Sequence, residues 1–273
     1  MTLQFDIHAA GALAPGVGSL ADLLALRRGE FVMTNTATAL PSPQSLPANE
    51  RRRASQVVRL TMACAEQVLR VSPFPVDSLR LVFASDEGTG EVCQQMLETL
   101  ATTRQVSPLL FHNSVHNAPS GYFSIAYQSR QPATSVSLGK QSFAGGLLCA
   151  VSEALSSHQP VLLLCYDPAM TDPMHALLPV SSATACAWII TAGDGNVIST
   201  LALARFALTL RPADNDEDDL LPSWLPLAWT ANSSALGLAA LGLLDDKGAP
   251  GACDLRLGAQ RMRLERLDGA TAC

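Results

Sequence analysis

The chain has 273 residues, of which 48% are hydrophobic and 15% charged, and its mean hydropathy is +0.21. This length can bury a full core as one large domain or two small ones. The high apolar content is consistent with a buried subunit interface. No apolar run is long enough to span a bilayer, and the first residues lack the basic segment of a secretory signal. We therefore expect a cytoplasmic protein with no membrane span.

The charged residues and the cysteines argue against further classes of protein and of binding site. The net charge is −6, and the cluster 51–53 (RRR) is typical of a solvated helix start, so we expect no nucleic-acid partner. The acidic run 214–219 (DNDEDD) lacks the glycine and distal glutamate of a calcium loop and is interpreted as a surface loop. The seven cysteines are scattered without a CxxC pair, which is typical of reduced thiols in a cytosolic protein.

Predicted strands and helices alternate over the first 180 residues. The first strand is followed by a helix that Ser19 is placed to cap, and residues 35–49 have the composition of a loop. The expected strands are 3–13, 79–84, 134–138, 160–166, 184–192 and 198–210, and the expected helices are 17–27, 49–71, 91–103 and 143–157. This order favours an α/β fold with a mainly parallel sheet, to which a hairpin turning at 193–196 adds antiparallel strands.

The pattern changes after Leu210. Residues 222–244 are a Trp- and Leu-rich helical stretch with interruptions, and residues 254–267 alternate apolar and basic side chains like an edge strand. We expect one domain over 1–210 and a C-terminal helical and strand remainder over 211–273 packed on it.

Standard catalytic motifs are absent from the sequence, including the G-x-S-x-G elbow, the Walker loop and HExxH. The sequence 88–90 (GTG) fits a phosphate-binding turn, but a tight strand-to-helix turn explains it better. Cys165 with His175 is the best Cys/His pair, yet Cys165 lies in a strand so apolar that we interpret it as core. His112 and His116 have helical metal-ligand spacing without a third ligand, and we interpret them as polar loop residues.

The sequence 139–146 (GKQSFAGG) lies where the strand 134–138 leads into the helix 143–157. Such a junction presents free backbone N–H groups and the positive end of a helix dipole. Many enzymes place a nucleophile there, so this turn is the first candidate site.

Residues 105–155 resemble the ketosynthase segment that leads to the catalytic cysteine. The sequences 7–16 (IHAAGALAPG), 51–69 and 79–91 are similar to earlier parts of the same family, in the same order. The matching positions of the central segment are Ser107, Pro108, Asn117, Gly121, Ile125, Tyr127, Arg130 and Pro132. The chain is most similar to short chain-length-factor-like subunits of aryl-polyene and type II polyketide systems. This beta-ketoacyl synthase resemblance implies a thiolase-like half, a layered α/β fold with a mixed central sheet.

Two departures from the family bear on catalysis. Alignment on the helix puts Phe143 at the nucleophile position, and alignment on the strand puts Lys140 there. Gln141 and Ser142 lie between them, so the position holds no cysteine. The second half of a ketosynthase, which supplies the catalytic histidines, is also missing, and no histidine follows His175. The resemblance therefore implies no catalytic residue, and neither a cofactor nor a metal.

A scaffold without its catalytic groups implies a non-catalytic subunit that forms a heterodimer with an active ketosynthase. Acyl carrier protein would bring the substrate, in polyketide, aryl-polyene or fatty-acid-like biosynthesis. By resemblance, Val115, His116 and Phe143 could cap or shape the partner's acyl tunnel. The bulky Phe143 would block the space where an acyl chain otherwise enters. The strand 133–138 would join the partner's sheet. The implied interface residues of that strand are Ser135, Val136, Ser137 and Leu138.

Two alternatives stay open. The chain could act alone as an acyltransferase or thioesterase that uses Ser142, Cys165 or His116. It could also be a purely structural scaffold of a synthase complex.

Overall fold

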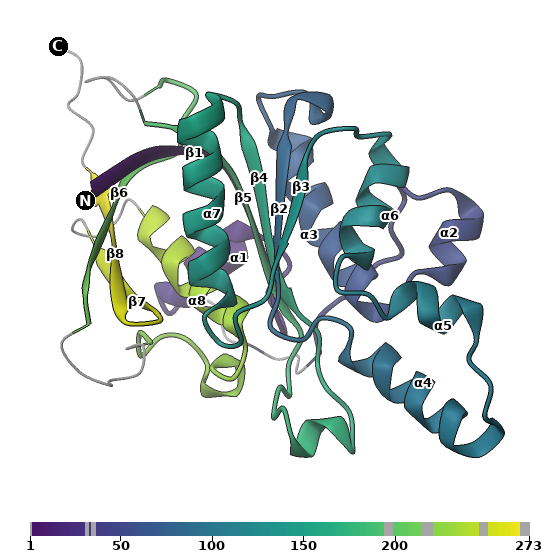
Figure 1. The fold of residues 1–273 in the computed structure, drawn as a ribbon. Coiled ribbons are helices and arrows are strands. Elements are labelled where there is room, and N and C mark those ends of the chain that lie inside the picture. The colour runs from purple at the N-terminus through teal and green to yellow at the C-terminus, as the bar shows by residue number, and fades with distance from the viewer. Residues whose placement is uncertain are drawn as a thin grey trace, which may run out of the picture.

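The computed structural model describes residues 2–30, 33, 37–193, 199–213, 221–245 and 251–267. An eight-stranded sheet runs through its centre in the order β3-β2-β4-β5-β1-β6-β8-β7 (Figure 1). The strands are β1 (Thr2–Leu13), β2 (Arg80–Ala84), β3 (Ala133–Val136), β4 (Val161–Asp167), β5 (Thr184–Ala192), β6 (Ala204–Pro212), β7 (Ala252–Leu257) and β8 (Gln260–Leu267). β2 pairs in parallel with β3 and β4, and the other pairs are antiparallel. The mixed sheet that the family resemblance implies is confirmed. The mainly parallel sheet expected from the order of strands and helices is wrong.

Helices cover both faces of the sheet. The α-helices in the described residues are α1 (Leu20–Arg27), α2 (Ala48–Arg53), α3 (Gln56–Val71), α4 (Gly90–Thr103), α5 (Pro108–Asn113), α6 (Ala118–Tyr127), α7 (Ser142–Ser157) and α8 (Ser233–Leu241). The fully buried strand β4 separates two cores because its side chains alternate. Leu163 and Cys165 belong to the core under α7 and α8, whereas Leu162 and Leu164 belong to the core under α3. Figure 1 shows α4 projecting away from this body.

The single helix expected over 49–71 is wrong, because the chain forms α2 and α3 with a break between them. Ala54 and Ser55 at the break have extended backbone, with ψ of 120° and 169°. α2 buries none of its residues, whereas α3 buries one whole face against the sheet. The break therefore lets the amphipathic α3 pack on the sheet while the arginine-rich α2 stays in solvent.

The hairpin expected from 184–192 and 198–210 is also wrong. β5 and β6 do not pair with each other, because β1 lies between them and pairs antiparallel with both. Every residue of β1 from Phe5 to Leu13 is buried, and an apolar strand of this kind needs neighbours along both edges. The expected turn residues 194–196 lie outside the described residues, as does the acidic run 214–219.

The C-terminal residues extend the same sheet. The single edge strand expected over 254–267 is a hairpin, β7 and β8, which turns at Gly258 with a φ of +60°. A positive φ is accessible to glycine at little cost. The interrupted helical stretch over 222–244 is confirmed as a short 3₁₀ turn, the fully buried α8 and a second 3₁₀ turn. Among the helices that the structure describes, none has the length and apolarity to cross a membrane.

Gly237 allows α8 to pack tightly on the core, and its substitution should destabilise the protein. A Cβ atom at Gly237 would collide with the Cys186 sulfur and lie 2.8 Å from the Phe143 ring. We expect Gly237→Ala to lower the unfolding free energy by about 1–3 kcal/mol through overpacking, as measured by urea unfolding. Gly121→Ala in α6 is the control, because nothing lies within 4 Å of its added Cβ. This control should leave stability unchanged or raise it by up to about 1 kcal/mol, and an equal loss in both variants would contradict the packing argument.

Candidate functional site

The strand–helix junction, residues 137–143, connects β3 to α7. β3 is the terminal strand of the sheet and pairs with β2 through four residues. After β3, Gly139 adopts a φ of +62°, which lets the chain turn sharply into the helix. Ser137, Leu138 and Lys140 are exposed, whereas Ser142 and Phe143 are fully buried. The junction therefore has a solvent-facing turn and an inward-facing helix start.

Ser142 closes this turn. Its hydroxyl accepts a hydrogen bond from the Leu138 N–H at 2.8 Å and donates one to the Gly139 carbonyl at 2.7 Å. Both bonds go to the backbone, and the side chain is fully buried. The hydroxyl proton is therefore committed to a structural bond, and the geometry is not that of an activated nucleophile.

Phe143 fills the space beneath the junction. Its ring is 0% exposed and lies 5.6 Å from the Trp188 ring, between centroids, at a tilt of 56°. Gly237 of α8 lies against the same ring. A site that binds a substrate needs an open cavity, and here an aromatic side chain occupies that volume.

Most of the backbone N–H groups at the start of α7 are used within the chain. An oxyanion site needs such donors free and aimed at a common point. The observed pairs are Gln141 N to Leu138 O at 3.2 Å, Ser142 N to Gly139 O at 3.0 Å, Phe143 N to Ser233 Oγ at 2.8 Å, and Gly145 N to Gln141 O at 2.9 Å. The hydroxyl of Ser233 thus occupies the place where an oxyanion would accept a bond from Phe143.

Gln141 and Lys140 link the junction to its surroundings. The Gln141 side-chain oxygen accepts a bond from the Gly258 N–H at 2.7 Å, which connects the junction to the β7–β8 turn. Burial raises the pKa of Asp86, and the charges of Asp167 and Glu87 add to the rise, whereas the Lys140 ammonium opposes it.

A buried carboxylate that sequence reasoning missed organises the base of the site. Asp167, at the end of β4, is 2% exposed. Its Oδ1 accepts bonds from the Asp86 N–H at 2.9 Å and the Ser85 hydroxyl at 3.3 Å. Its Oδ2 accepts bonds from the Ser234 N–H at 2.7 Å and hydroxyl at 2.8 Å. The negative charge lies at the N-terminus of α8, where the helix dipole stabilises it.

This network reaches from α8 to the α5–α6 connection. The Thr184 hydroxyl contacts the Ser234 hydroxyl at 2.6 Å and accepts a bond from the Asn232 amide at 2.8 Å. On the other side, His116 Nε2 lies 3.3 Å from the Ser85 carbonyl. The structure therefore places His116 beside the end of β2, while Val115 remains 43% exposed.

The other sequence candidates are not brought together. Burial raises the pKa of the Cys165 thiol well above its usual value, and Cys186 faces it across β4 and β5. His175 contacts Ser181 at 3.1 Å and Asp172 at 4.0 Å instead of Cys165. No group of three potential metal ligands occurs within the described ranges. In the GTG turn, a Cβ on Gly88 would lie 2.8 Å from the Ser85 hydroxyl, so close packing accounts for that glycine.

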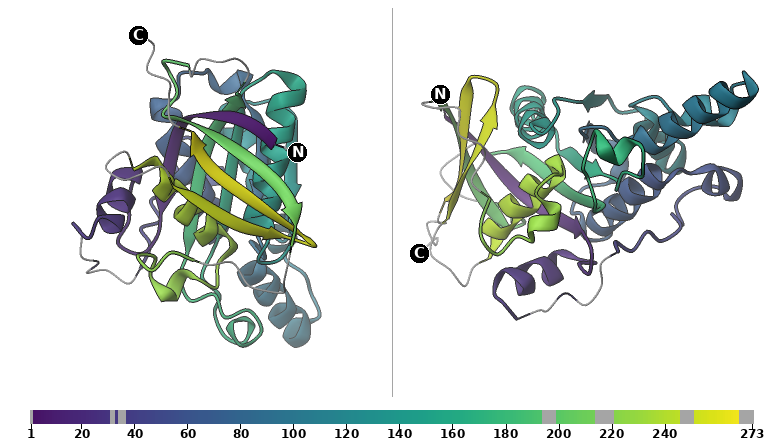
Figure 2. Two further views of the ribbon diagram at one scale, coloured as in Figure 1. Left: turned by 90° about the vertical axis from the view of Figure 1, so that its left-hand side faces the viewer. Right: turned by 90° about the horizontal axis from the view of Figure 1, so that it is seen from below.

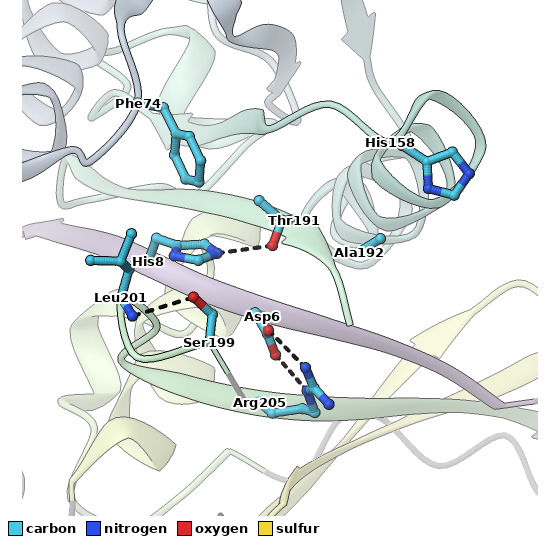
Figure 3. A pocket seen from close by; sticks show the side chains of 9 residues that line it. All are labelled: Asp6, His8, Phe74, His158, Thr191, Ala192, Ser199, Leu201 and Arg205. Carbon is cyan, nitrogen blue, oxygen red and sulfur yellow. Dashed lines mark hydrogen bonds and ion pairs between the residues drawn. The ribbon is translucent and has the colours of Figure 1, made fainter. Parts of the chain in front are cut away.

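A pocket of about 340 Å³ lies at the other end of α7, where His158 caps the helix (Figure 3). Its base holds a buried ion pair in which Arg205 donates to both carboxylate oxygens of Asp6, at 2.6 and 2.9 Å. His8 Nε2 lies 2.9 Å from the Thr191 hydroxyl. α7 has 16 residues and is about 24 Å long, so this pocket is separate from the junction.

Residues 28–237 match the family model described as beta-ketoacyl synthase, N-terminal domain. A chain from the structure of a ketosynthase (ApeO) in complex with its chain length factor (ApeC) from Xenorhabdus doucetiae matches with a TM-score of 0.72 and 23% identity, covering 97% of this chain and 100% of that chain. None of the curated proteins matches this chain.

Two further solved structures have a similar fold. A chain of the type II polyketide synthase complex AntDE:AntF, an acyl-carrier protein with its ketosynthase bound to the hexaketide, gives a TM-score of 0.74 at 10% identity. That match covers 98% of this chain and 100% of that chain. A chain of the ishigamide ketosynthase/chain length factor gives 0.70 at 11% identity, covering 97% and 100%.

The buried His8 should make stability depend on pH. Burial lowers the pKa of His8 below its ordinary value of 6.5, and a bond to the Leu201 backbone and the charge of Asp6 oppose this. The unfolded chain then binds the proton more tightly, so stability is lost as the pH falls below about 6.5. We expect His8→Gln to flatten the dependence of the unfolding free energy on pH between about 7.5 and 5.5.

Chemical unfolding at several pH values measures this slope. His112→Gln, which removes an exposed histidine from α5, is the matched control. A slope that is unchanged in His8→Gln, or flattened equally by both substitutions, would contradict the assignment to His8.

Proposed function

Because the chain belongs to the family of the beta-ketoacyl synthase N-terminal domain and has its thiolase-like α/β fold, we propose that it is a non-catalytic subunit of chain-length-factor type. The observation that carries this proposal is the occupied junction. In the alignment on the helix, Phe143 takes the nucleophile position, and its buried ring fills the space beneath the junction. The Ser233 hydroxyl accepts the Phe143 N–H bond that an oxyanion would otherwise take. Acyl transfer at this position would require both a thiolate and a free oxyanion site.

The geometry supports the alignment that puts Phe143 at the nucleophile position. Phe143 is the second residue of α7 and points into the core, whereas Lys140 lies on the exposed turn. We therefore assign Phe143 to the degenerate nucleophile position. Because its ring is enclosed by Trp188 and Gly237, we propose that Phe143 blocks the acyl space of this chain rather than lining a partner's tunnel.

We propose that the heterodimer forms through the open edge of β3. Terminal strands present unpaired N–H and C=O groups that pair readily with another strand. Exposed apolar side chains occur on α4, α5 and α6, in the connections between these helices, and after β3. They are Leu97, Leu100, Val106, Leu109, Phe111, Val115, Ile125 and Leu138. An apolar surface next to an open sheet edge fits a stable subunit interface, and we propose an active ketosynthase as the partner, with Ser135, Val136, Ser137 and Leu138 in the contact.

The same interface would set the product length. Val115 follows α5 with its side chain exposed, and His116 beside it is held by the Ser85 carbonyl. In a heterodimer, Val115 would reach the partner's acyl tunnel while His116 fixes the loop. An acyl carrier protein would deliver the growing chain to the partner's cysteine, in polyketide, aryl-polyene or fatty-acid-like biosynthesis.

The stand-alone enzyme has less support. The Ser142 hydroxyl bonds only to backbone groups, and the Cys165 thiol is fully buried with a raised pKa. His116 lies against a backbone carbonyl, without a nucleophile among its hydrogen-bond partners in the described part of the chain. The scaffold alternative differs from our proposal only in whether this chain sets the length of the product. An experiment can distinguish the two.

Co-expression with a candidate ketosynthase tests the proposal. We expect a 1:1 complex by size-exclusion chromatography with light scattering. Product formation should be lost when the partner's catalytic cysteine is replaced, and should stay within about twofold in Cys149→Ala and Cys165→Ala of this chain. Thioester hydrolysis or self-acylation by the isolated chain would instead establish the stand-alone enzyme.

Val115→Trp tests control of product length. If Val115 lines the partner's tunnel, the larger side chain should shorten the acyl product by at least one extension unit, as measured by mass spectrometry, while the complex stays intact. Val71→Trp, on the exposed end of α3, is the control and should leave the products unchanged. An intact Val115→Trp complex with unchanged products would favour the scaffold.

A further inference from the structure

Two cysteines lie directly opposite each other on neighbouring strands of the sheet. β4 and β5 pair without a register shift from Val161 to Asp167, and Cys165 of β4 is the partner of Cys186 of β5. Directly opposite residues of antiparallel strands have Cα atoms about 4.5–5.5 Å apart, and a disulfide needs a separation of about 4.4–6.8 Å. The backbone of the sheet therefore already holds this pair at a distance that a disulfide can bridge.

The two thiols also share one environment. Both side chains are fully buried and belong to the core under α7 and α8. The Cys186 side chain is a hydrogen-bond partner of the Cys165 thiol, so the sulfur atoms are neighbours as well as the backbones. Among the strands that the structure describes, the other cysteine is Cys253 of β7, which is opposite Leu264, and Cys64 of α3 belongs to the core on the other face. The strand register thus selects Cys165 and Cys186 as a pair.

Helix α8 covers this pair. It packs on β4 and β5, and Figure 2 (right) shows it against the sheet. The Ser233 hydroxyl is a hydrogen-bond partner of the Cys165 thiol. A Cβ atom on Gly237, one turn further along α8, would collide with the Cys186 sulfur. The first turns of α8 therefore shield both thiols from solvent.

The bonds that anchor α8 lie close to each cysteine along the chain. Asp167 follows Cys165 by two residues and accepts bonds from the Ser234 N–H and hydroxyl at 2.7 and 2.8 Å. Thr184 precedes Cys186 by two residues, and its hydroxyl lies 2.6 Å from the Ser234 hydroxyl. Access to the thiols and the attachment of α8 to β4 and β5 consequently depend on the same bonds.

We propose that Cys165 and Cys186 are a redox pair, which hydrogen peroxide converts to a cross-strand disulfide when α8 opens. While α8 is closed, burial raises the pKa of the Cys165 thiol, and a buried thiol of this kind is unreactive. After local opening, one sulfur attacks the peroxide, the O–O bond breaks, and the thiol proton leaves with hydroxide as water. The sulfur is then a sulfenic acid, and the second thiol displaces water from it to form the S–S bond. The pair thus gives up two electrons, and the peroxide becomes two waters.

The disulfide would hold β4 and β5 together beneath α8. A bridge from Cys165 to Cys186 closes a loop of about 20 residues, which restricts the unfolded chain. We therefore expect the oxidised protein to melt about 5 °C higher than the reduced protein, and dithiothreitol to reverse this shift. The pair does not depend on the proposed role of the chain as a subunit, because both strands and α8 belong to this chain.

The test treats the folded full chain with hydrogen peroxide and follows it by mass spectrometry. A peptide map without reductant should show the peptides of Cys165 and Cys186 joined, with the loss of two hydrogen atoms. Cys165→Ala and Cys186→Ala should each lose this bridge, whereas Cys64→Ala, which removes a buried cysteine from the other face, should keep it. Ser234→Ala removes a hydroxyl bond that closes α8, so the bridge should form about tenfold faster.

Several outcomes would overturn the proposal. Thiols that stay reduced in the folded chain, under treatment that oxidises them in urea, would be ordinary core residues. A map that joins Cys165 to other cysteines as often as to Cys186 would show reaction of an unfolded chain. An unchanged rate in Ser234→Ala would show that α8 does not control access, and a bridged form that melts no higher than the reduced one would contradict the link between β4 and β5. If an alanine variant does not fold, the wild-type map alone decides whether the pair forms.

Discussion

The carboxylate of Asp167 is the interaction on which the arrangement of the site depends. Through four accepted hydrogen bonds it joins the ends of β2 and β4 to the start of α8. Breaking such a buried anion away from its donors would leave several polar groups without partners, at a cost of about 1–3 kcal/mol for each. Because α8 is held in this position, Ser233 reaches the Phe143 N–H and Gly237 reaches the Phe143 ring. The closed junction is thus a consequence of where α8 is anchored.

The junction shows how a strand-to-helix turn can be stable without a ligand. A helix start normally leaves N–H groups that require an external acceptor. Here the Ser233 hydroxyl accepts from the Phe143 N–H, and the carbonyls of Gly139 and Gln141 accept from the Ser142 and Gly145 N–H groups. Most of the N–H groups at the positive end of α7 therefore have acceptors within the chain, which is the physical basis for proposing a silent subunit.

Local sequence patterns predicted much of the fold, since strands and helices depend on side-chain periodicity over short distances. β4, α7 and the Ser19 cap of α1 lie where the sequence places them. The break between α2 and α3 and the insertion of β1 between β5 and β6 were missed because they depend on contacts distant in sequence. The Asp167 network was missed for the same reason, since Ser85 and Ser234 lie 82 and 67 residues from it. An aspartate after a fully apolar strand, with a Ser-Ser pair opening a later helix, was the available signal.

The two ends of the sheet differ in their protection against unwanted pairing. β7 and its neighbour carry charged side chains, which discourage another strand from adding to that edge. β3 has the sequence Ala-Thr-Ser-Val, without a charge or a proline. A free edge of this kind pairs with any compatible strand, including that of a second copy. If no other chain covers this edge, β3 offers a site for self-association, and a chain produced without such a cover would carry that hazard.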